Sequence, residues 1–397
     1  MSPSSSTPFL VTGGGIGGLA AALALARAGH AVRLLERAPE FAEVGAGLQV
    51  GPNASRVLDR LGVLDAVTAT AFFPSRLTLR DALSGQRLTS LDTGDVFRER
   101  FGYRYFVAHR ADLHRALLVA CEESGLVELI PGKEIAEISE DHAGPRVRCA
   151  DGSEFTAGAL VAADGLYSPA RRLLIDDGDP VDSGYVAYRG TVPIEALTPQ
   201  GGLREPDGMV IWVGPSLHLV QYPVRSGQLC NQVATIDTRR YTAHAGDLDA
   251  QLRAAFADTC PDVQAGIALM DTTRRWPMLD RSPALGWSRG SITLVGDAAH
   301  PMLQYLAQGA CQAIEDGAAL ADAVDEHPGD TEAAFKAYET VRAPRTARVQ
   351  TTARKWGEVL HVDGIGRDLR AALLAARTTT DYDVVDWLYG YNAGTAA

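Results

Sequence analysis

Residues 9–18 read FLVTGGGIGG and lead directly into LAAALALARAG at residues 19–29. The apolar start is typical of a buried strand, the glycines of a tight turn, and the alanine- and leucine-rich continuation of a helix. Gly13 permits the sharp turn, Gly15 lets the backbone approach a pyrophosphate, and Gly18 lets the helix pack against the strand. Because the helix N-terminus also presents free N–H groups to an anion, this stretch predicts a dinucleotide site.

A second apolar run, at residues 31–35, ends in Glu36. This is about the spacing from the glycines, roughly twenty residues, at which a carboxylate accepts hydrogen bonds from an adenosine ribose. A glycine-rich turn without any ligand is the alternative interpretation, and the glycine motif alone would leave it open. The strand, the helix and the acid all stand in register, which favours the dinucleotide.

The composition is that of a globular protein with a large core. The chain has 397 residues, of which 46% are hydrophobic, enough for two or three lobes. Its formal net charge of −12 argues against non-specific binding to nucleic acid or anionic membranes, because both depend on a positive patch. Residues 1–7 lack the basic and apolar segments of a signal peptide, and no apolar run is long enough to span a bilayer.

The cysteines and histidines do not have the spacing of a metal site or a disulfide framework. The five cysteines lie far apart, without a C-x-x-C pair. His109, His114, His300 and His361 show no metal-ligand spacing, so we expect no metal. A reducing cytoplasm is therefore the expected compartment.

The order of the expected elements indicates a nucleotide-binding domain that is interrupted by a second sheet. Buried strands at residues 159–163 and 291–295 belong to an alternation of strands and helices, whereas residues 185–237 read as successive strands. The expected boundaries are 1–75, 101–180 and 289–345 for the nucleotide-binding domain, 76–100 and 181–288 for the inserted sheet domain, and 346–397 for a C-terminal helical segment.

Three segments carry a resemblance to a known family. They are Gly13 to Gly18 with Glu36, Asp164-Gly-x-x-Ser168-x-x-Arg171, and Gly296-Asp297-x-x-His300-Pro301. In this order and spacing the chain resembles, over essentially its whole length, the class A flavoprotein aromatic hydroxylases, which are single-component FAD-dependent monooxygenases. The resemblance implies an α/β fold: a Rossmann-like FAD-binding domain with a parallel sheet and a small antiparallel meander, an inserted mixed β-sheet substrate domain, and C-terminal helices.

The same resemblance assigns the parts of FAD to residues of this chain. It places the adenosine ribose on Glu36, the pyrophosphate on Gly15 to Gly18 and Arg110, the adenine near Ile135, and the ribityl chain and ring at Asp297 and Gly309-Ala310. Asp164 would serve both FAD and a passing nicotinamide cofactor. The implied cofactor-binding residues are Gly13, Gly15, Gly17, Gly18, Glu36, Arg37, Gln49, Arg110, Ile135, Asp164, Asp297, Gly309 and Ala310. Taken alone, Arg110, Ser168 and Arg171 would instead be interpreted as solvated charges or helix caps.

The segments at residues 214–223 and 300–311 are similar to those of a narrower group in the family, the 3-hydroxybenzoate 6-hydroxylases. This similarity implies that His218 and Gln304 act on a phenol and that Tyr222 lies near it; a structural histidine in a sheet is the alternative for His218. His218 and Tyr222 would share one face of a strand, because alternate residues point the same way. Gln221 stands where that group more often has histidine, and we expect it to point away from the substrate.

We therefore expect an FAD-dependent, NAD(P)H-consuming hydroxylase of a monohydroxybenzoate-type phenol that works through a flavin hydroperoxide. The leading reaction converts 3-hydroxybenzoate to 2,5-dihydroxybenzoate (gentisate). Hydroxylation of 6-hydroxynicotinate or salicylate is the alternative within the family, and a flavin-binding sensor or carrier without turnover is the alternative from another class. FAD is expected to be non-covalent and NADH or NADPH transient. The expected partners are a small aromatic carboxylate substrate and O2. We expect neither nucleic-acid binding nor a membrane span, and the sequence leaves open whether the protein forms a homodimer.

Overall fold

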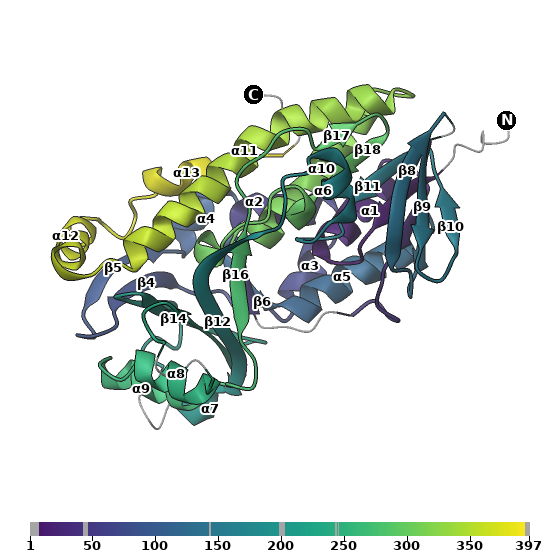
Figure 1. Cartoon of the computed structure of the whole chain (residues 1–397). Coiled ribbons are helices and arrows are strands. Elements are labelled where there is room, and N and C mark those ends of the chain that lie inside the picture. Colours follow the sequence, from purple (N-terminus) through teal and green to yellow (C-terminus); the bar gives the residue numbers. More distant parts are fainter. Residues whose placement is uncertain are drawn as a thin grey trace.

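The computed structural model describes residues 8–42, 47–142, 144–197, 203–242, 244 and 246–393. Two large sheets organise this part of the chain, and we call the regions around them the parallel-sheet unit and the mixed-sheet unit (Figure 1). Within the described ranges, no helix combines the length and the apolar character needed to cross a membrane.

The parallel-sheet unit is built on six strands in the order β17–β18–β11–β1–β2–β7. These are β1 (Phe9–Thr12), β2 (Val32–Leu35), β7 (Val127–Ile130), β11 (Ala159–Ala162), β17 (Ser288–Arg289) and β18 (Ile292–Leu294). All neighbours pair in parallel except β17 with β18. Helices cover both faces of such a sheet, which is why its central strands are apolar runs rather than alternating patterns.

Helix α1 (Ile16–Arg27) follows the glycine turn and packs between α5 (Arg110–Glu123) and α10 (Gly309–Glu326). Its alanine- and leucine-rich residues 18–26 are buried because small side chains let neighbouring helices approach closely. The antiparallel meander of β8 (Ile135–Asp141), β9 (Gly144–Cys149) and β10 (Glu154–Thr156) lies at the side of this unit (Figure 1).

The mixed-sheet unit is built on seven strands in the order β16–β12–β15–β14–β13–β4–β5. They are β4 (Arg76–Asp81), β5 (Arg87–Asp92), β12 (Val181–Pro193), β13 (Met209–Gly214), β14 (Leu217–Val224), β15 (Leu229–Asp237) and β16 (Trp276–Asp280). Only β4 and β13 pair in parallel. Helices α8 (Leu248–Ala255) and α9 (Pro261–Ala268) cover one face, where Leu252 and Val263 pack with Trp212 and Leu219 (Figure 1).

The C-terminal helices join the two units. Helix α11 (Thr331–Leu360) packs on α10 and passes the short helix η3 (Gln304–Leu306), and it crosses the top of the molecule in Figure 1. The expected boundary between residues 345 and 346 falls inside this helix. The remaining elements are β3 (Gly47–Val50), β6 (Phe106–His109), α2 (Pro52–Arg60), α3 (Leu64–Thr68), α4 (Asp95–Phe101), α6 (Pro169–Leu174), α7 (Ile194–Leu197), η2 (Gly296–Ala298), α12 (Gly364–Ala375) and α13 (Asp383–Tyr389).

The predicted fold class is confirmed by this arrangement: an α/β fold with a parallel sheet, a small antiparallel meander, a mixed second sheet and C-terminal helices. Strands β4 and β5 form an antiparallel hairpin, and this hairpin pairs through β4 with β13. Residues just after β1 and β18 and residues of β12, β13, β14 and β15 line one cavity.

Candidate active site

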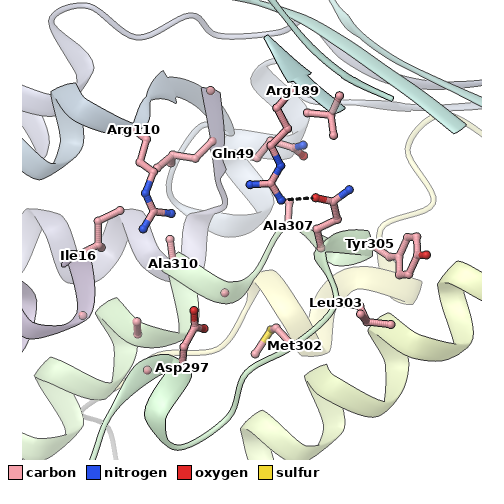
Figure 2. Close-up of a pocket in the computed structure, with 18 of the residues that line it drawn as sticks. Ile16, Gln49, Arg110, Arg189, Asp297, Met302, Leu303, Tyr305, Ala307 and Ala310 are labelled. Carbon is pink, nitrogen blue, oxygen red and sulfur yellow. Dashed lines mark hydrogen bonds between the residues drawn. The ribbon is translucent and has the colours of Figure 1, made fainter. Parts of the chain in front are cut away.

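A cavity of about 450 Å³ lies where the two units meet. It receives residues from the start of α1, from β3, from the start of α5, from β12 and β14, and from residues 295–313. Of the predicted site residues, it is lined by Gly15, Gly17, Gln49, Arg110, His218, Tyr222, Asp297, Gln304, Gly309 and Ala310. In Figure 2, Arg110 and Arg189 point into the cavity from one side and Asp297 from the other.

The glycines at the start of α1 leave no room for side chains. Gly13 has a φ of +98°, and a Cβ there would lie 2.3 Å from the carbonyl oxygen of Ala163. A Cβ on Gly18 would lie 1.8 Å from the carbonyl oxygen of Gly13. Gly15 is the N-cap of α1, so the first free N–H groups of that helix face the cavity. Bare backbone beside a helix N-terminus fits the pyrophosphate of FAD.

Glu36 is fixed beside the glycine turn by two backbone hydrogen bonds. The N–H of Gly14 donates to Oε2 at 2.6 Å and the N–H of Ala38 donates to Oε1 at 2.8 Å. A carboxylate offers about four acceptor positions, so each oxygen can still accept a ribose hydroxyl. Arg37 is exposed and Ile135 is half-buried against the core, and neither lines the cavity.

Asp164 carries a buried carboxylate that lacks good partners. Both of its oxygens are buried, and neither makes a hydrogen bond of good geometry within the described residues. Burial raises the pKa of Asp164 to about 6. Its neighbour Gly165 lines the cavity although Asp164 itself does not. An unsatisfied buried acceptor at this position fits a ligand that brings a donor.

Ser168 and Arg171 act within the protein rather than in the cavity. The hydroxyl of Ser168 caps α6 by accepting the N–H of Arg171 at 2.9 Å. The buried guanidinium of Arg171 donates to the carbonyl oxygens of Ala298 and Ala299 at 2.9 and 2.6 Å. Arg171 therefore holds the loop that presents Asp297, whose own side chain is exposed at the cavity.

A buried ionic cluster of Asp316, His300 and Arg342 supports the loop that carries Asp297. Asp316 accepts the N–H of Gly296 at 2.9 Å, bonds His300 Nε2 at 2.6 Å, and accepts Arg342 Nε at 2.8 Å. Burial opposes ionisation of this carboxyl, but His300 and Arg342 nevertheless lower the pKa of Asp316 to about 2. Charged partners compensate for the lost hydration, so the cluster can remain buried beneath Asp297.

Strand β14 separates its polar residues by face, as the sequence predicts. His218, Val220 and Tyr222 line the cavity. Gln221 points the other way, where it accepts the N–H of Trp212 Nε1 at 2.9 Å and donates to Gln232 Oε1 at 2.9 Å. The predicted orientation of Gln221, away from the substrate side, is confirmed.

His218 is buried and bonded to a second histidine. Its Nδ1 lies 2.8 Å from Nε2 of His361, and the two rings have centroids 5.0 Å apart and planes 18° from parallel. Burial, with a smaller contribution from His361, holds the pKa of His218 well below its ordinary value. The ring is therefore neutral, and because Nδ1 is engaged, Nε2 is the nitrogen that a ligand in the cavity can use.

Gln304 is held by two side chains, one of which the sequence did not single out. Arg189 Nη2 donates to Gln304 Oε1 at 2.7 Å, the bond that the dashed line at Arg189 marks in Figure 2. Gln304 Nε2 donates to Thr235 Oγ1 at 3.1 Å. Thr235 is also the cross-strand neighbour of His218. Arg189 and His361 both come from segments far along the chain from these partners, so no local motif marks them.

Tyr222 is packed in a closed corner of the cavity. Burial raises the pKa of its phenol above the ordinary range, so this side chain is a neutral hydroxyl at physiological pH. A Cβ on Gly47 would lie 2.6 Å from the Tyr222 ring, which shows how closely β3 approaches β14. Gln49 of β3, also at the cavity, accepts the hydroxyl of Tyr105 at 2.6 Å.

The known proteins that this chain resembles include FAD-binding proteins and 3-hydroxybenzoate 6-hydroxylases. Residues 6–353 match the model of a family described as FAD binding domain. The chain is 40% identical over 391 residues to the 3-hydroxybenzoate 6-hydroxylase of Polaromonas naphthalenivorans, covering 98% of this chain and 96% of that protein. It is 38% identical over 386 residues to the 3-hydroxybenzoate 6-hydroxylase of Klebsiella oxytoca, covering 96% of each. A solved structure of Klebsiella pneumoniae HpxO complexed with FAD and uric acid has a TM-score of 0.83 at 30% identity, covering 96% of each chain.

Proposed function

This chain belongs to the FAD-binding-domain family and is an FAD-dependent monooxygenase of aromatic rings, and from that premise we propose that it converts 3-hydroxybenzoate to 2,5-dihydroxybenzoate. NAD(P)H and O2 are the co-substrates in this proposal. Its support is the 38–40% identity to two 3-hydroxybenzoate 6-hydroxylases over nearly the whole chain, together with the polar residues of the cavity.

The residues present fit FAD. The closely packed glycines at the start of α1, Glu36 beside them, and the exposed carboxylate of Asp297 offer sites for the pyrophosphate and the hydroxyls. The first turn of α10, at Gly309 and Ala310, faces the same cavity with the positive end of its dipole. When bound, FAD supplies the exchange of electrons with NAD(P)H and the transfer of oxygen to the ring.

The single observation that carries the substrate proposal is a neutral histidine beside two polar side chains in a cavity. His218 offers Nε2 as a base for a phenolic O–H, while Gln304 and Tyr222 offer hydrogen bonds that orient the ring. A phenolate is more electron-rich than a phenol, so removal of this proton activates the ring toward attack.

A benzoate carboxylate needs a local cation in a protein of net charge −12. Arg189 meets that requirement in the proposal, because its guanidinium lines the cavity and already contacts Gln304. Since a guanidinium can donate more than one hydrogen bond, it can hold Gln304 and a carboxylate together. The five cysteines are free and buried, so a reducing cytoplasm, where NAD(P)H is available, is the compartment we propose.

The decisive experiment is a substrate screen with product identification. The purified FAD protein is given NADH or NADPH with 3-hydroxybenzoate, 6-hydroxynicotinate or salicylate, and oxidised nicotinamide, peroxide and products are counted. We expect 2,5-dihydroxybenzoate in near-stoichiometric yield only from 3-hydroxybenzoate. Coupled turnover of another compound would replace the substrate, and a protein that holds FAD but never turns over would be a sensor or carrier. Whether the protein forms a homodimer, which the sequence leaves open, can be tested on the same sample by light scattering.

A further inference from the structure

A second cavity, of about 470 Å³, adjoins the first on the side of α11. Leu303 and Tyr305 line both cavities and so form part of the wall between them. The second cavity has a charged lining that includes Arg239 and Glu358, whose side chains are 65% and 61% exposed. Water can therefore reach this cavity, while His218 and His361 are themselves only 3% and 7% exposed.

The two histidines span the wall between these cavities. His218 lines the first cavity and His361 lines the second, and their facing nitrogens are 2.8 Å apart. Tyr185 stacks on the far side of His361, with ring centroids 4.7 Å apart and planes 19° from parallel. Tyr305 contacts both imidazoles edge-on or tilted. This packing fixes the rings in line, so a hydrogen-bonded path leads from one cavity to the other.

The path solves a problem that a buried base creates. A phenolic proton taken up by His218 would leave an imidazolium in a site without an acidic neighbour within the described contacts, and burial disfavours that charge. His361 is no better as a resting place, because burial, aided by Arg370, lowers its pKa to about 3. Neither ring can keep the proton, but each can accept it on one nitrogen while releasing another from the opposite nitrogen.

We propose that His361 is a positioning residue that passes the substrate's phenolic proton from His218 to the second cavity. This inference rests on the proposed function, since it requires a phenol. The O–H bond of the phenol breaks as its proton moves to Nε2 of His218. The proton on Nδ1 of His218 moves to Nε2 of His361, and the proton on Nδ1 of His361 moves to water.

Only O–H and N–H bonds change, no electrons are exchanged, and one proton reaches solvent for each phenolate formed. When the hydroxylated product is reprotonated, the same transfers run in reverse and restore both tautomers. The groups that face His361 are His218 from β14, Tyr185 from β12, Tyr305 from η3 and Arg370 from α12, with Glu358 on its own helix.

The test measures proton release rather than turnover. Oxidised holoenzyme in weak buffer is mixed with 3-hydroxybenzoate, without NAD(P)H, and a pH-indicator dye is followed by stopped flow. We expect the wild type to release protons on binding, and His361→Gln to release them about 10²-fold more slowly. Glutamine can keep a hydrogen bond to His218, but an amide does not exchange protons between its two ends at neutral pH. The KM for 3-hydroxybenzoate and the FAD content should change little.

Chemical rescue separates a relay from a structural contact. Added imidazole should restore fast proton release to His361→Ala, because the freed space opens to the second cavity. His327→Gln, at the far end of α10, is the matched control and should behave as the wild type. Fast release by His361→Gln would overturn the relay, as would a wild type that forms 2,5-dihydroxybenzoate without releasing protons on binding. A wild type that neither releases protons nor forms this product would instead overturn the proposed function. If His361→Ala loses FAD, His361→Gln alone decides.

Discussion

At the scale of single residues, His218 gives the sharpest test of the candidate site. His218→Ala should still bind FAD and accept electrons from NAD(P)H, since the glycine turn, Glu36 and Asp297 are untouched. Hydroxylation should fall by about 10²–10⁴, the usual contribution of a positioned general base. The measurement is product and peroxide formed per nicotinamide oxidised at saturating 3-hydroxybenzoate, and peroxide should rise as product falls.

Gln304→Ala is the companion variant. It removes an orienting amide, which is held by Arg189 and Thr235, but leaves the base in place. Its loss of hydroxylation should therefore be smaller than that of His218→Ala. A His218→Ala enzyme that stays fast and well coupled would make that histidine a structural residue.

Asp164 predicts a pH-dependent stability difference. Its pKa is about 6 in the folded protein and near 3.8 in the unfolded chain. Above pH 6 the folded state carries a disfavoured buried charge; between pH 6 and 4 the folded state binds a proton that the unfolded state does not, so stability rises as the pH falls. Asp164→Asn should therefore stabilise the FAD-free protein by about 1–3 kcal/mol at pH 7.5.

This advantage should disappear below about pH 4, where both states are protonated. Urea unfolding followed across the pH range measures it. Asp297→Asn is the matched control, because it makes the same substitution at an exposed side chain. If Asp164→Asn is less stable than the wild type at pH 7.5, the interpretation of Asp164 as a buried carboxylate without good hydrogen-bond partners is wrong.

At the scale of elements, the contact of α1 with α10 depends on a glycine. A Cβ on Gly317 would lie 2.9 Å from the backbone of Ala20, so Gly317→Ala must push the helices apart. Gly309→Ala, in the same helix, meets nothing within 4 Å and serves as control. Although both gain helix propensity, Gly317→Ala should be less stable than Gly309→Ala by about 1–3 kcal/mol. Urea unfolding of the FAD-free variants measures this, and equal stabilities would refute the tight contact.

Whether a structural feature can be predicted from this sequence depends on how far apart along the chain the contacting residues lie. The glycine turn and the alternation of His218 with Tyr222 are local patterns, so their geometry could be predicted. The contact of His218 with His361 joins residues 143 apart, and that of Arg189 with Gln304 joins residues 115 apart. Neither pair belongs to one period or motif, and only packing of separate elements brings them together. The buried partnership of Asp316 with Arg342 escaped prediction for the same reason.

At the scale of the whole molecule, FAD should act as a structural ligand. The cavity that the FAD-binding residues line also receives residues of the mixed-sheet unit, so bound FAD should raise the stability of the two units together in one unfolding transition. At a free concentration of 100 times Kd the gain should be about 2.7 kcal/mol. Thermal unfolding during an FAD titration measures it, and two separate transitions, with only one shifted, would contradict a shared site.

FAD should be released as an intact, unmodified molecule when the protein is denatured. Because the predicted FAD contacts are hydrogen bonds and backbone donors, acid precipitation should release the yellow colour into the supernatant. Asp297→Ala should weaken FAD binding by about 1.5–3 kcal/mol, the value of a hydrogen bond to a charged group. Flavin fluorescence during titration gives the affinity, and a coloured acid pellet would show a covalent link.

Helix α11 has a consequence for how this chain can change over time. In its first half, Arg342 supports the Asp297 loop through Asp316. Near its end, Gly357 packs so closely against Tyr305 that a Cβ at Gly357 would lie 2.4 Å from the tyrosine ring. The two positions are about 22 Å apart along one unbroken helix. A single inserted residue between them would rotate everything beyond it by about 100°. Helix α11 therefore fixes the distance and the rotation between these two contacts. Substitutions can accumulate along it, while insertions and deletions cannot.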